Sequence, residues 1–187
     1  MLGFVMDLLN AQPLFALKRG SVREVAVFGV AAIARGPAIH TTHGDVPIVA
    51  RSLLKPWQFL NCEIEMDAAA WLLAVSSQAG QDLHQECLGT LEGLTGINVE
   101  SLSCPPSLPM DQTEAERCRA QHIAPARRFH PCAGKHLAHR FAAARAGFSQ
   151  DYLAPEHPLQ RRLEASLAAT LRDPHHWVVD SLSLIHI

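Results

Sequence analysis

The pattern of apolar residues changes once along the chain, and this change limits the folds that the chain can adopt. Residues 14–34 are rich in Val, Ala, Ile and Phe, which favour strands, and an Arg-Gly pair at 19–20 interrupts them. From Asp67 onward the apolar residues recur at helical spacing instead. Strands followed by helices are typical of an α/β or α+β domain rather than of a regular βαβ repeat.

The strand-like part predicts an antiparallel pair formed by residues 14–18 and 22–34, with a turn between them. A polar, glycine-containing loop is expected over 35–45, followed by a short strand at 46–50. The end of that strand would deliver residues 51–52 to a junction with a helix. The expected architecture is therefore an antiparallel sheet with a helical layer beside it.

The helical part carries helix-forming composition in four stretches, separated by polar or proline-rich segments. A polar loop is expected at 76–80, and three prolines make 104–109 irregular. The predicted helices cover 67–75, 82–94, 134–146 and 156–171.

Composition narrows the functional classes. With 187 residues, 48% of them apolar and 18% charged, the chain can bury one substantial core, which predicts one globular domain. The net charge of -2 and the lack of a basic block argue against a nucleic-acid surface. The sequence offers no signal peptide and no apolar run that would span a membrane, so a cytoplasmic location is expected. The five cysteines have no repeated spacing, which argues against a disulfide scaffold.

The first chemical motif is Ser52-x-x-Lys55, preceded by Arg51. A serine hydroxyl is a weak nucleophile unless a base takes its proton, and a lysine can act as that base if burial or a nearby cation lowers its pKa. Residues three apart on a helix share a face, so the two side chains are within reach of each other. The competing interpretation is a helix-capping serine followed by a solvated lysine.

The second chemical motif is Cys132-x-Gly134-Lys135-His136, which is expected to enter a helix through a tight turn. The alternative is a glycine turn with a buried cysteine and a surface lysine. His136 and His139 lie on one helical face near Cys132, but a structural zinc site needs four ligands with recognisable spacing. That pattern is absent from the sequence.

Ser77, in the polar loop, offers a second hydroxyl that can shuttle a proton between a nucleophile and a leaving group. As a single residue, its alternative role is a helix cap.

In this order and spacing, the motifs resemble those of the bacterial asparaginase II family of the rhizobial type, over roughly residues 14–180. The resemblance implies hydrolysis of L-asparagine to aspartate and ammonia, on a fold similar to serine β-lactamases and penicillin-binding proteins. The residues that carry it are Arg19-Gly20, Glu24, Gly29, Gly44-Asp45, Arg51-Ser52-x-x-Lys55-Pro56, Gln58, Ser77, Gly80, His84, Cys132-x-Gly134-Lys135-His136 and Glu156-His157-Pro158-x-Gln160.

Carried onto this sequence, the resemblance implies that Ser52 is the nucleophile and Lys55 its base. Arg51 would tune the site, and Ser77 would form a second Ser-Lys arrangement with Lys135. The partner implied is a small-molecule substrate, L-asparagine.

The resemblance also implies a zinc ion that supports substrate binding, with Cys132 and Lys135 among its ligands. The chemical steps themselves require no cofactor. His136 and Asp180 would contribute to substrate binding. A third ligand, the cysteine of an Asp-Gly-Cys turn, has no counterpart after Asp180.

The chain departs from the family pattern at several positions. The family loop Ser-His-x-Gly-Glu is Ser77-Gln78-Ala79-Gly80-Gln81 here, and Ala133 replaces a serine. The family's Glu-Ser-x-His-x-Gly segment is Glu24-Val25-Ala26-Val27-Phe28-Gly29. We therefore expect residues 1–180 to be the N-terminal portion of a catalytic domain and 181–187 to be a tail unrelated to the family. The complete protein is expected to be able to form a homo-oligomer.

Two other functions remain open on these residues. A β-lactamase-like acyl hydrolase would use the same Ser-x-x-Lys motif but also needs Ser-x-Asn and Lys-Thr-Gly, which this sequence lacks. A non-catalytic relative would keep the scaffold and bind a small amino acid or a partner protein.

Overall fold

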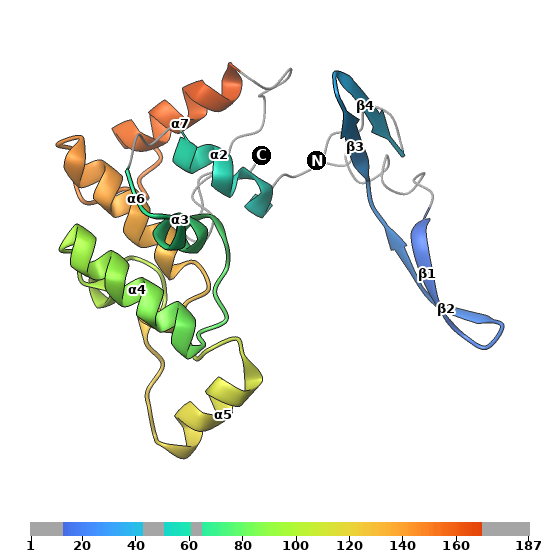
Figure 1. The fold of residues 1–187 in the computed structure, drawn as a ribbon, viewed down its shortest axis with the longest axis horizontal. Coiled ribbons are helices and arrows are strands. Elements are labelled where there is room, and N and C mark those ends of the chain that lie inside the picture. Colours follow the sequence, from blue (N-terminus) through green and yellow to red (C-terminus); the bar gives the residue numbers. More distant parts are fainter. Residues whose placement is uncertain (1–12, 43–50, 61–64, 170–187) are drawn as a thin grey trace. The chain divides into compact units, whose positions relative to one another are not determined.

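A computed structural model describes residues 13–42, 51–60 and 65–169. The chain divides into two compact units, residues 1–49 and 50–187, which are described separately (Figure 1). The described strands lie in the first unit and the described helices in the second, and the division falls near the expected strand-to-helix junction at 51–52, before the helical spacing that begins at Asp67.

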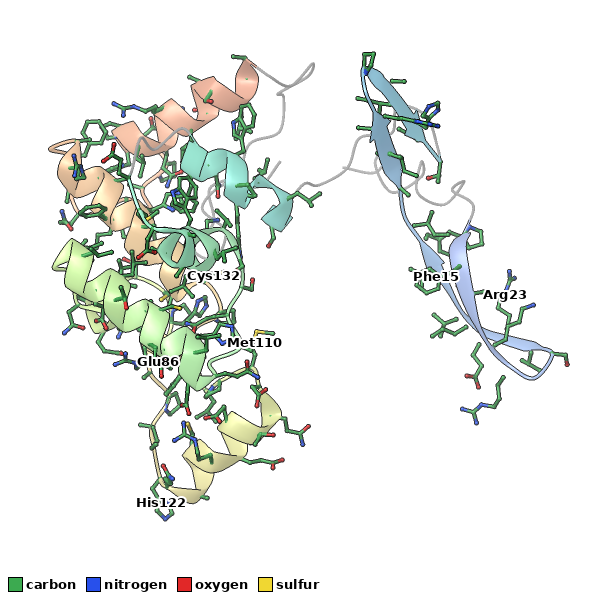
Figure 2. All side chains as sticks on the ribbon, in the orientation of Figure 1. Phe15, Arg23, Glu86, Met110, His122 and Cys132 are labelled. Carbon is green, nitrogen blue, oxygen red and sulfur yellow. The ribbon has the colours of Figure 1, made fainter. Side chains whose placement is uncertain are left out.

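The first unit begins with the predicted hairpin. Strand β1 (Pro13–Arg19) pairs antiparallel with β2 (Val22–Phe28). Gly20 lies between them with φ of +62°, a conformation that residues with a side chain rarely adopt. The prediction of an antiparallel pair with a turn at 19–20 is confirmed for this part. Figure 2 shows Phe15 and Arg23 on the two strands.

A second hairpin follows, where the sequence predicted the continuation of one strand and then a loop. Strand β3 (Ala32–Arg35) pairs antiparallel with β4 (Ala38–Thr41), and Gly36 forms the turn with φ of +60°. The single strand over 22–34 was therefore wrong, and so was the polar loop for residues 35–42; residues 43–45 lie outside the described residues. Backbone pairing across a glycine turn outweighed the polar character of the segment. The strand expected at 46–50 lies outside the described residues.

The second unit contains the predicted helices, with boundaries shifted by a few residues. Asp67 caps α3 because its carboxylate accepts a hydrogen bond from the Ala70 backbone N–H. Gly96, with φ of +67°, ends α4. The elements are η1 (Arg51–Leu54), α2 (Lys55–Leu60), α3 (Ala68–Val75), α4 (Asp82–Thr95), η2 (Val99–Ser101), α5 (Gln112–Ala120), η3 (Arg127–Phe129), α6 (Ala133–Arg145) and α7 (Pro158–Ala168).

Helix α5 was not predicted. It is a polar helix with only Ala115 and Cys118 buried, so it has almost no apolar stripe to reveal it in the sequence. Its visible signal is Asp111, whose side chain caps the helix by accepting from the Glu114 backbone N–H.

Helix α6 contributes to both apolar clusters of the second unit. Ala138 and Ala142 pack in one cluster with Phe59 and with α7, whereas Ala133 and Leu137 pack in the other with α3 and α4. The helix packs directly against α3 and also contacts α4. Its first turn is therefore held deep in the unit.

Close contact between α3 and α6 depends on Gly134. A Cβ atom added there would lie 2.6 Å from both the backbone oxygen and the Cγ atom of Leu73. No other residue type fits without movement of one helix. The glycine predicted to allow a tight approach therefore permits helix-helix packing.

The coarse expectation of a mixed fold with antiparallel strands and helices is confirmed. In the described residues the strands form two separate two-stranded sheets rather than one. None of the described helices has both the length and the apolar composition needed to cross a membrane.

Candidate active site

Ser52 and Lys55 lie on consecutive elements at the beginning of the second unit. Ser52 is in the 3-10 helix η1, and Lys55 is the first residue of α2. Pro56 follows in the first turn, where its missing N–H costs no helical hydrogen bond, as predicted. Ser52 is exposed, but Lys55 is only 2% exposed. Arg51 opens η1, and its side chain lies outside the described part of the structure.

The Lys55 ammonium group binds the loop that follows α3. Its Nζ donates to Ser77 Oγ at 2.9 Å and to the Ser76 backbone oxygen at 3.1 Å. Among the described residues, these hydrogen bonds join Lys55 to residues 76 and 77 and not to Ser52. The capping role considered for Ser77 belongs to Ser76, whose backbone N–H and hydroxyl both donate to the Leu72 oxygen. Ser77 is instead the hydroxyl partner of a buried lysine.

Lys135 is also buried, with 1% of its surface exposed, so the alternative of a surface lysine is wrong. Burial lowers the pKa of its amine from 10.5 to about 7; the nearby Cys132 acts against this shift, and the positive charge of Lys55 adds to it. The amine therefore exchanges its proton near neutral pH. Its electrostatic interaction with Lys55 places the two lysines in one neighbourhood, although they are 80 positions apart in the sequence.

The turn before α6 brings His130 and Cys132 to the same region. The Cys132 backbone N–H donates to His130 Nδ1 at 3.1 Å, so that nitrogen acts as an acceptor. Burial lowers the pKa of His130, and the charge of Lys55 lowers it further. Cys132 lies at the N-terminal end of α6 and is half-buried (Figure 2).

The two remaining histidines of this segment are enclosed. His136 Nδ1 lies 2.9 Å from the Tyr152 hydroxyl oxygen. His139 Nδ1 lies 3.0 Å from the Lys135 backbone oxygen; because a carbonyl only accepts, this nitrogen carries the proton. The ring of His139 packs edge-on against that of Phe59, with 4.5 Å between the ring centroids. Burial holds the pKa of His139 well below its ordinary value. Asp180, the other residue expected to bind substrate, lies outside the described residues.

The donors available to zinc in the described part of the chain are too few. Cys132 and Lys135 supply two donor atoms, and no group of three His, Cys, Asp or Glu side chains suited to a metal occurs within residues 13–42, 51–60 and 65–169. A zinc site needs at least three protein ligands, so these residues by themselves do not fit one.

Sequence reasoning missed a set of buried polar contacts around Gln78. Its side-chain nitrogen donates to the backbone oxygens of Arg128 at 2.6 Å and His130 at 3.0 Å. Gln85, on α4, donates to the Gln78 side-chain oxygen at 3.1 Å and accepts from Arg128 Nε at 2.9 Å. The only signal in the sequence was a glutamine in the polar loop, where the asparaginase II pattern has histidine.

The site therefore contains the exposed hydroxyl groups of Ser52 and Ser77 and the buried Lys55, which is hydrogen-bonded to Ser77. It also contains a second buried lysine, Lys135, which is partly neutral near pH 7. This set can take a proton from a hydroxyl and return it to a leaving group.

Comparison with known proteins adds a finding that does not depend on this geometry. The family model for L-asparaginase II matches residues 16–183 of the chain, which include both lysine-containing motifs and the Ser77 loop. A comparison with curated proteins found no match.

Proposed function

Because the chain belongs to the L-asparaginase II family, we propose that it is an amidohydrolase that converts L-asparagine to L-aspartate and ammonia. The observation that supports a serine-lysine mechanism most directly is the 2.9 Å hydrogen bond between Lys55 Nζ and Ser77 Oγ. It joins a buried amine to an exposed hydroxyl. A proton can move between them while the substrate approaches from the solvent side.

In the proposed first half-reaction, Ser52 Oγ attacks the side-chain amide carbon of asparagine. The Lys55 ammonium gives one proton through the Ser77 hydroxyl to the amide nitrogen, which leaves as ammonia, and takes the Ser52 proton in its place. The C–N bond breaks as the Ser52–acyl ester forms, so no further reactant is consumed. The burial of Lys55 and the exposure of Ser52 suit these roles.

In the second half-reaction, water attacks the ester and releases aspartate, and the proton of the water returns to the serine oxygen. Lys135 is suited to support Ser77 in this proton movement. Its pKa of about 7 leaves a substantial fraction of the amine neutral at neutral pH. A neutral amine accepts a proton, which a fully charged lysine cannot do.

The deciding experiment measures ammonia release from L-asparagine by the full chain and by Ser52→Ala and Lys55→Met variants. We expect both variants to lose at least about 100-fold in kcat. Ser149→Ala, at an exposed serine far along the chain, is the control and should keep the parent rate. A parent chain that releases no ammonia would contradict the proposal. Full activity in Ser52→Ala together with inactivity in Ser77→Ala would transfer the nucleophile role to Ser77.

The same assays separate the alternative functions. A β-lactamase-like acyl hydrolase would open a chromogenic β-lactam and leave asparagine intact. A non-catalytic relative would bind asparagine or aspartate in calorimetry without turnover. The β-lactamase-like fold, the cytoplasmic location and the homo-oligomer also stay predictions, of which light scattering checks the last.

A further inference from the structure

We propose that Gln78 is a positioning residue: its buried side-chain amide sets where Ser77 lies relative to the turn at 128–132 that leads into α6. The kinetic part of this inference rests on the proposed function. A second readout, the alkylation of Cys132, does not.

Gln78 is tied to three of four consecutive residues in that turn. Its Nε2 donates to the backbone oxygens of Arg128 and His130, at 2.6 and 3.0 Å. Its own backbone N–H donates to the Pro131 oxygen at 3.0 Å. The side chain is 1% exposed, so water cannot replace these bonds. The loop carrying Ser77 and the turn before Cys132 therefore move together.

The orientation of the Gln78 amide is fixed from the α4 side. Arg128 can only donate, and its Nε donates to the side-chain oxygen of Gln85 at 2.9 Å. The Gln85 nitrogen therefore faces Gln78 and donates to Gln78 Oε1 at 3.1 Å. This leaves the Gln78 nitrogen to face the two backbone oxygens. The orientation of the Gln85 amide thus follows from Arg128, whose guanidinium only donates, and the orientation of the Gln78 amide follows from Gln85.

The turn itself is held from its other side. The Glu100 carboxylate accepts from the backbone N–H groups of Arg127 and Arg128, at 3.0 and 3.1 Å. With these residues anchored, the Gln78 amide links the turn to the Ser77 loop. Its neighbour Ser77 accepts from Lys55, and the turn continues into Cys132. A change at Gln78 therefore alters the spacing of groups that come from three separate elements.

The isosteric variant Gln78→Glu tests this inference because it keeps the shape of the side chain, removes its N–H groups and places a negatively charged carboxylate against two backbone oxygens. The matched control is Gln81→Glu, which makes the same charge change three residues later. Gln81 is exposed, and its amide donates to the Asp111 side chain instead. We expect Gln78→Glu to lower kcat about 10- to 100-fold with KM changed less than about 3-fold. The control should stay within about 2-fold in both.

The second readout is the rate at which iodoacetamide alkylates Cys132 in the full chain, followed by peptide mass spectrometry. Loss of the Gln78 bonds should free the turn and raise this rate at least about 5-fold. Buried Cys104 is the internal reference, because a general loosening of the fold would raise both rates equally. Gln81→Glu should change neither rate.

Gln85→Ala keeps the inference testable if Gln78→Glu does not fold. It removes the group that orients Gln78 while leaving the bonds from Gln78 to the turn, so we expect the same changes at about 3- to 10-fold in kcat. A folded Gln78→Glu variant with unchanged kcat and unchanged Cys132 alkylation would overturn the inference, as would equal acceleration of Cys104 and Cys132. A parent without asparaginase activity whose Cys132 still responds selectively would refute the proposed function and support the positioning role.

Discussion

The side-chain nitrogen of Lys55 lies 2.9 Å from the hydroxyl oxygen of Ser77, a residue 22 positions later in the sequence. This contact joins the first residue of α2 to the loop after α3. It provides Lys55 with a partner outside its own Ser-x-x-Lys motif. The candidate site is thus built from tertiary contacts as well as from local spacing.

Removing the Ser77 hydroxyl tests the importance of this contact. We expect Ser77→Ala to lower kcat for asparagine hydrolysis about 100-fold, because the proton path to the leaving group is interrupted. Ser77→Thr keeps a hydroxyl and should recover part of the rate. Steady-state ammonia assays at neutral pH measure both variants. Equal activity of the alanine and threonine variants would show that the hydroxyl has no chemical role.

Lys135 should make stability depend on pH. Its pKa is about 7 in the folded chain and 10.5 in the unfolded chain, so between these values the unfolded chain binds the extra proton. The free energy of unfolding should therefore rise with pH above about 7. Lys135→Met lacks this rise. Its stability relative to the parent should fall by about 2–3 kcal/mol between pH 7 and pH 9.

Urea denaturation at several pH values, in buffer containing a chelator, measures this difference. The range stops at pH 9 because burial raises the pKa of Cys104 from 9.0 to about 11. Above pH 9 this thiol ionises in the unfolded chain but not in the folded one, so it lowers the free energy of unfolding. Parallel pH dependences in the parent and in Lys135→Met would mean that the buried amine is not the titrating group.

Gly134 is expected to tolerate no side chain. Gly134→Ala would place a methyl group 2.6 Å from the Leu73 backbone oxygen, which should lower the free energy of unfolding by about 1–3 kcal/mol. Gly89, on α4, is the matched control because a Cβ atom there meets nothing within 4 Å. Gly89→Ala should stabilise the chain by about 0.5–1 kcal/mol. Equal effects of the two substitutions in urea denaturation would contradict this packing argument.

Tyr152 links the loop before α7 to the middle of the second unit. Its hydroxyl lies 2.9 Å from His136 Nδ1 and accepts from the Ser103 backbone N–H at 3.4 Å. Tyr152→Phe keeps the ring but leaves these groups without that oxygen, so we expect a loss of about 1–3 kcal/mol in the free energy of unfolding. Thermal or urea unfolding monitored by circular dichroism measures it. A loss below about 0.5 kcal/mol would mean that the hydroxyl is not a structural partner.

Local patterns predicted the elements best where capping and periodicity agreed. Asp67 before α3 and Pro158 at the beginning of α7 are both visible in the sequence, and both helices begin beside them. The second hairpin was missed because β3 continued the apolar run read as one strand, and because the polar residues His40 and Thr41 of β4 also suit a loop. Helix α5 was missed because it buries almost no apolar surface.

The candidate site was predictable only in part. The motifs around Lys55 and Lys135 were visible, but their burial was not, because a lysine in a short motif is usually solvated. The contacts of Gln78 were also not predictable. They depend on backbone oxygens 50 and 52 residues away, which no local pattern specifies.

The sequence by itself determined the change from strands to helices, the first hairpin, four of the helices with the residues that begin or end them, and the motifs that indicate the family. These properties depend on neighbouring residues and on helical or strand spacing. Only the tertiary structure decided that Lys55 pairs with Ser77, that Lys135 is buried and has a lowered pKa, and that Gln78 joins two loops. The reason is physical: desolvation and hydrogen bonding between distant segments depend on which surfaces meet when the helices pack.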